Sequence, residues 1–144
     1  MHSSVIAINA HPTEETVLEQ LPKGADYVID RTTNPRWLCG AYEQMRLIGA
    51  VNESGGVKPI HENVKMALES MYDRWVKSAF GSFDDFTDDY KVFRAKAALD
   101  DNYGLYVYYG DWDECVPWAH FLRWLYHKDV EGALRIEAVY DYHF

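Results

Sequence analysis

The stretch VIAINAHPTEE at residues 5–15 predicts a strand that leads directly into a helix. Its first four residues are apolar, as in a short buried strand, whereas the proline and the two glutamates that follow favour the first turn of a helix. Pro22-Lys23-Gly24 ends this helix, and residues 25–31 have the composition of a second strand. Residues 1–33 are therefore expected to form a βαβ unit.

The middle of the chain, residues 34–101, has the pattern of a helical insertion. Asn34-Pro35 is typical of a helix start, and apolar residues recur at helical spacing after it. A loop-like stretch at 52–59 precedes a long amphipathic helix predicted over 60–79. A third helix is expected after four closely spaced aspartates, because negative charge stabilises a helix N-terminus.

Residues 102–144 repeat the alternation of the first segment. An apolar, tyrosine-rich run at 104–109 predicts a strand, residues 117–126 predict a helix, and apolar and polar residues alternate over 134–141 as in a half-buried strand. We therefore expect an α+β fold over a single domain, residues 1–144. Its simplest form is a four-stranded sheet from two βαβ units with ferredoxin-like connectivity, with the three-helix insertion between them or forming a separate helical lobe.

Composition bounds the possible functions. The 144 residues carry 23 acids and 14 Lys or Arg, a net charge of −9, which argues against direct binding of nucleic acid. No apolar run approaches the roughly 20 residues of a membrane span, and no basic leader precedes the first apolar run, so a cytoplasmic protein is expected. Cys39 and Cys115 match no zinc or redox spacing, and nothing in the chain indicates a cofactor.

The acidity is concentrated between residues 84 and 114, where nine acids face only three Lys or Arg. Aromatic residues are interspersed with the later acids, and spaced carboxylates with exposed rings favour docking on a basic protein. An ordinary solvated acidic face is the alternative. The candidate partner-binding residues are Asp84, Asp85, Asp88, Asp89, Asp100, Asp101, Asp111, Trp112, Asp113 and Glu114.

These features suggest a non-enzymatic acidic module that inhibits a basic, nucleic-acid-handling partner by nucleic-acid mimicry, as anti-restriction and anti-CRISPR proteins do. An immunity or antitoxin-like protein would need the same acidic face. The aromatic content also makes a homodimer possible.

An enzyme is the alternative of a different class. Asp111 and Asp113 follow a predicted strand, and two such carboxylates could hold Mg²⁺ in a small hydrolase or transferase. Cys115 at the start of the next helix, with His120 or His127 as base, is a weaker candidate, because neighbouring acids raise the pKa of a thiol. A buried, inert thiol is the expected role of Cys115.

Overall fold

A five-stranded mixed sheet organises the protein. The computed structural model describes residues 2–21, 27–77, 79, 81–99, 105–110, 112 and 114–143. The strand order is β2-β7-β1-β5-β6, in which β1 is parallel to β5 and antiparallel to β7. The strands are β1 (His2–Ile8), β2 (Tyr27–Arg31), β5 (Leu105–Tyr109), β6 (Val116–Pro117) and β7 (Ile136–His143).

The predicted α+β class is confirmed, but the four-stranded ferredoxin-like sheet is not. The first unit is a split βαβ, because α1 (Glu14–Glu19) joins β1 to β2 and β7 lies between these two strands. The second predicted βαβ unit does not form, because β7 runs antiparallel to β1 and therefore also to β5. β7 pairs with β1 on one edge and with β2 on the other, so it is an interior strand of the sheet with no free edge.

Helices cover both faces of the sheet. Ile6 and Ile8 of β1 face one core, which includes side chains of α2 (Pro35–Leu47), α3 (His61–Met71) and α6 (Trp118–His127). Val5 and Ala7 point to the opposite face, where they share a second core with Val17 of α1. All four of these β1 side chains are fully buried, as the period of two in a strand requires when both faces are covered.

The stretch predicted as a loop contains a β-hairpin. Strands β3 (Gly49–Val51) and β4 (Val57–Pro59) pair with each other, and Val57 also bridges to Leu134. The side-chain oxygen of Asn52 accepts hydrogen bonds from the backbone N–H groups of Ser54 and Gly56, which fixes the turn.

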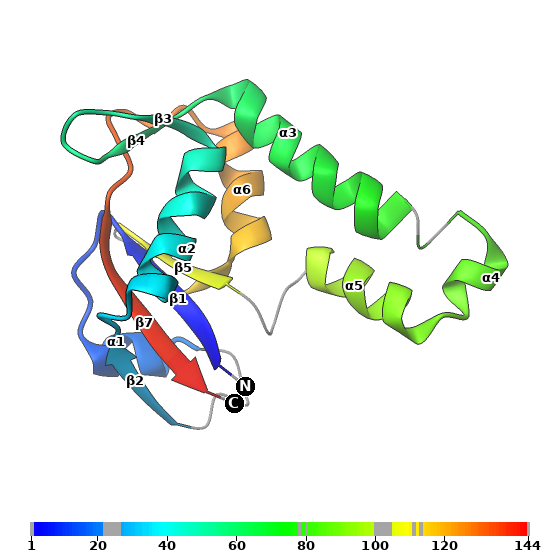
Figure 1. The fold of residues 1–144 in the computed structure, drawn as a ribbon, viewed down its shortest axis with the longest axis horizontal. Helices are drawn as coiled ribbons and strands as arrows, with labels where there is room; N and C mark the ends of the chain where they lie inside the picture. The colour runs from blue at the N-terminus through cyan, green and yellow to red at the C-terminus, as the bar shows by residue number, and fades with distance from the viewer. Residues whose placement is uncertain are drawn as a thin grey trace.

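A helical arm extends from this sheet domain. The helix predicted over 60–79 is α-helical only to Met71 and continues as the π-helix η1 (Tyr72–Lys77). Beyond it lie α4 (Phe83–Phe86) and α5 (Asp89–Leu99). We call Tyr72–Lys77, Ala79 and residues 81–99 the arm, and the rest of the described chain the body; Figure 1 shows α4 at the far end of the arm.

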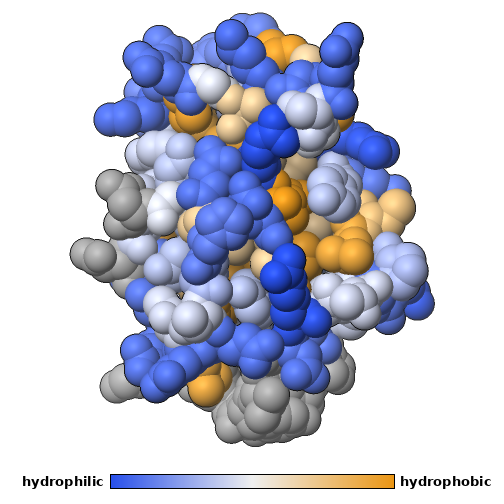
Figure 2. Space-filling model, turned by 90° about the vertical axis from the view of Figure 1, so that its left-hand side faces the viewer, coloured by the Kyte–Doolittle hydropathy of each residue, from blue (hydrophilic) through white to orange (hydrophobic). Residues whose placement is uncertain are grey.

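The face opposite the arm differs in character. Figure 2 shows it largely covered by hydrophilic residues, with hydrophobic atoms visible only in small patches between them. The two ends of the chain also lie together in the body, since His2 of β1 pairs with His143 of β7. Within the described chain, no helix has the length and apolar character needed to span a membrane.

Candidate functional site

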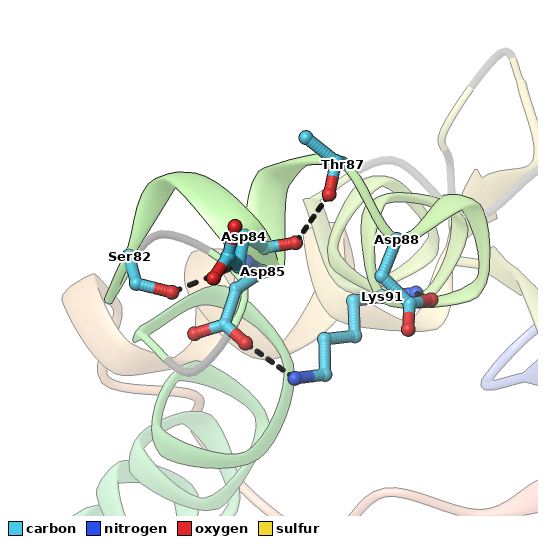
Figure 3. A network of polar contacts seen from close by, with 6 residues as sticks. All are labelled: Ser82, Asp84, Asp85, Thr87, Asp88 and Lys91. Carbon is cyan, nitrogen blue, oxygen red and sulfur yellow. Dashed lines mark hydrogen bonds and ion pairs between the residues drawn. The ribbon is translucent and has the colours of Figure 1, made fainter.

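The aspartates of the arm lie at the N-terminal ends of its two short helices, α4 and α5. Ser82 is the N-cap of α4, and its hydroxyl oxygen accepts a hydrogen bond from the backbone N–H of Asp85 at 3.2 Å. The Asp88 carboxylate accepts from the backbone N–H of Lys91 at 3.1 Å, which satisfies an otherwise unpaired donor in the first turn of α5 (Figure 3). The predicted place of aspartates at a helix N-terminus is confirmed for Asp88 and Asp89 at α5, whereas Asp84 and Asp85 lie in a separate short helix, α4, that was not predicted.

Asp85 also forms an ion pair that joins α4 to α5. Its Oδ1 lies 2.5 Å from Nζ of Lys91, as the dashed line in Figure 3 shows. Hydrogen bonding to Lys91, and secondly to Ser82, lowers the pKa of Asp85 below its usual 3.8, and Asp85 raises the pKa of Lys91 above 10.5. Two aspartates of the arm therefore stabilise the arm itself: Asp85 links α4 to α5, and Asp88 caps α5.

The other two aspartates, Asp84 and Asp89, are exposed. Among the described residues neither has a hydrogen bond or ion pair through its side chain. Their carboxylates therefore face solvent and do not stabilise the arm through a described hydrogen bond or ion pair.

Large aromatic side chains are exposed beside these carboxylates. Phe83 is 80% exposed, Tyr90 64%, Phe86 56% and Phe93 47%. Such a concentration of exposed rings on two consecutive short helices, α4 and α5, is unusual for a protein surface and is typical of a contact site. Sequence reasoning missed the phenylalanines; the repeated pairing of aspartates with rings in FDDFTDDY at 83–90 is the signal that could have found them.

The described members of the predicted acidic surface fall into two regions. Trp112 and Glu114 follow β5 in the body, whereas Asp84, Asp85, Asp88 and Asp89 lie on the arm. Trp112 packs against Tyr109, Phe121 and Trp124 and is part of the core periphery, while Glu114 is exposed. The remaining predicted residues, Asp100, Asp101, Asp111 and Asp113, lie outside the described residues.

The thiol considered as a nucleophile is buried. Cys115 is 8% exposed, and burial, together with the charge of Glu114, raises its pKa to about 12. A thiol with this pKa is almost entirely protonated at neutral pH and is a poor nucleophile. The expected burial of this thiol is confirmed.

His120 and His127, the candidate bases, are exposed on α6. In the part of the chain that the structure describes, no group of three His, Cys, Asp or Glu side chains could hold a metal ion. The proposed metal pair, Asp111 and Asp113, is not part of that description.

No protein-family model matches this chain, and no significant match is found among curated proteins or solved structures.

Proposed function

We propose that this protein is a non-enzymatic binding module that docks its arm on a basic protein. The observation that carries the proposal is the exposure of four aromatic rings next to two solvent-directed carboxylates on an element that projects from the body. Aromatic side chains supply most of the binding energy in protein interfaces, whereas charges at the rim govern the rate and specificity of association.

The class of partner follows from the charge. A net charge of −9 repels nucleic acid and acidic proteins and attracts a surface rich in Lys and Arg. Nucleic-acid-handling proteins have such surfaces in the grooves that bind phosphates. We propose that the arm occupies a groove of this kind and inhibits the partner, by the mimicry that anti-restriction and anti-CRISPR proteins use; an immunity or antitoxin-like role would use the same surface against a different partner.

The test is recovery of partners from native lysate with three forms of the protein. The first variant, Asp84→Asn/Asp89→Asn, removes the two solvent-directed charges and leaves the helix cap and the ion pair in place. The second, Phe83→Ala/Phe86→Ala, removes two exposed rings. The matched control, Glu43→Gln/Glu53→Gln, removes two exposed charges from the body.

We expect the wild type to recover a nucleic-acid-binding protein that duplex DNA or RNA displaces and that is lost at about 0.5 M salt, where the Debye length falls to a few Å. The charge variant should bind it roughly tenfold more weakly and the ring variant more weakly still, with the control unchanged. Equal recovery by all forms, or a partner that nucleic acid does not displace, contradicts the proposal.

A further inference from the structure

A large cleft lies where the arm meets the body. Its volume is about 1270 Å³, and it is lined by residues of α2, α3, η1, α5 and α6 and by the edges of β1 and β5. Pockets for small molecules usually measure about 300–1,000 Å³, so this cleft has room for a ligand of that size.

The charge of the cleft is opposite to that of the whole chain. Arg36 of α2, Arg74 of η1 and Arg94 of α5 line it, and no Asp or Glu is found among its described lining residues. None of these three guanidinium groups forms an ion pair with a described residue. Three arginines that form no ion pair with a described residue, in one concavity of a protein of charge −9, indicate a site for an anion.

Two of the arginines contact the same tryptophan ring. The guanidinium carbons of Arg74 and Arg94 lie 4.6 and 4.2 Å from the centroid of the same ring, that of Trp75. Contact with the ring stabilises each cation and limits the positions that its planar donor group can take. The Nε of Arg94 is buried and has no hydrogen-bond partner among the described residues, so the terminal nitrogens of this guanidinium are the ones that a ligand in the cleft could reach.

Flat aromatic surfaces lie in the same cleft. Trp37 of α2, Trp75 of η1 and Trp118 of α6 all line it, and each is partly exposed. Indole rings stack on nucleobases, and arginine is the preferred side chain for phosphate because its forked donors match two phosphate oxygens.

We propose that this cleft binds a nucleoside phosphate, with the phosphate on the arginines and the base against a tryptophan. The site shares Phe93 with the arm surface proposed above to dock on a partner, and its other lining residues do not belong to that surface. Arg36 belongs to the body and Arg74 and Arg94 to the arm, so both parts of the molecule line the site.

The test uses the purified protein without any partner, so that its outcome does not depend on the proposed function. Binding of AMP, GMP, CMP and UMP is measured by calorimetry and by quenching of tryptophan fluorescence, up to about 5 mM, where even an affinity near 1 mM is detected. Adenosine and ribose 5-phosphate test the base and the phosphate separately.

Two variants assign the binding to the cleft. Arg36→Ala removes an exposed guanidinium that forms no hydrogen bond or ion pair with a described residue, so the fold is expected to remain intact. Arg74→Gln removes one of the two arginine charges at Trp75. Arg46→Ala is the matched control, because Arg46 is an exposed residue of the same helix as Arg36 and does not line the cleft.

We expect at least one of the four nucleotides to bind, with adenosine and ribose 5-phosphate binding at least about tenfold more weakly than the best nucleotide. Each cleft variant should weaken binding by about tenfold or more, as the loss of a charge-assisted hydrogen bond predicts, while Arg46→Ala leaves it unchanged. Absence of binding by all four nucleotides, equal binding of ribose 5-phosphate, or unchanged affinity of both cleft variants overturns the proposal.

Discussion

The body and the arm of this protein are stabilised in different ways. In the body, β1 has four consecutive fully buried side chains, Val5 to Ile8, and both faces of the sheet are covered. In the arm, Ala79 and Ala95 are the buried side chains among the described residues, and most large rings are exposed. The body therefore depends on burial of apolar surface, and the arm depends on local polar contacts.

The comparison shows how one chain can present exposed rings without losing its fold. The energy of the arm comes from the two helix caps, from the Asp85–Lys91 ion pair and from the arginines on Trp75. These contacts are few and partly exposed to solvent, so the arm is expected to open locally more often than the body.

The largest expected difference is between two apolar truncations. Ile6→Ala removes a fully buried side chain from the central strand and should lower the free energy of unfolding by about 2–5 kcal/mol. Phe83→Ala removes more carbon atoms than Ile6→Ala does, but from a residue that is 80% exposed. It should therefore change the free energy of unfolding by about 0.5 kcal/mol or less. Urea unfolding followed by far-UV circular dichroism measures both, and similar losses would show that the arm is stabilised by burial after all.

The second prediction concerns the cap of α5. Asp88→Ala leaves the backbone N–H of Lys91 without its acceptor and should cost about 0.5–2 kcal/mol, seen as faster amide exchange in α5 with little change in the body. Asp88→Asn is the matched control, because it removes the same charge but keeps an equally good cap. If the asparagine variant exchanges as fast as the alanine variant, the charge rather than the cap holds the helix.

The smallest effect is a dependence of the arm on pH. The pKa of Asp85 is lowered in the folded arm, so its contribution is present above the usual value of 3.8 and is lost as the pH falls through the lowered pKa. The pKa of Lys91 is raised, so its contribution is present below 10.5 and is lost as the pH rises through the raised pKa. The Cα chemical shifts of α4 and α5 should therefore move toward random-coil values at both low and high pH.

Lys91→Met provides the reference for this titration. It removes the ion pair but keeps the backbone N–H that Asp88 caps. The acid-induced change in the arm should be smaller in this variant than in the wild type, and an identical acid limb in both proteins would exclude the ion pair as its cause.

Much of the body could be predicted from the sequence because its signals are local. Alternation of apolar and polar residues located β7, and apolar runs located β1 and β5. The order of the strands could not be predicted in this way, since periodicity does not specify which strands are neighbours. The β3–β4 hairpin was missed because contacts distant in sequence support it, including hydrogen bonds from Arg135 to Ser54 and the bridge to Leu134.

The arm was only partly predictable. Two of its acids were correctly expected at the N-terminus of α5. The change from α-helix to π-helix at Tyr72 could not be predicted, because the spacing of apolar residues in the sequence hardly changes there. The arginine-lined cleft could not be found at all, because Arg36, Arg74 and Arg94 come from three separate helices and form no motif.

The pairing of the two chain ends has a mechanical consequence. His2 of β1 and His143 of β7 are opposite each other at the same end of an antiparallel pair. A force applied between residues 2 and 143 would pull these strands apart perpendicular to their axes and load the hydrogen bonds of the ladder one pair at a time. Under tension the protein should therefore unzip from its ends at low force, and the central strand of the sheet, although the most buried at rest, would be among the first to be released.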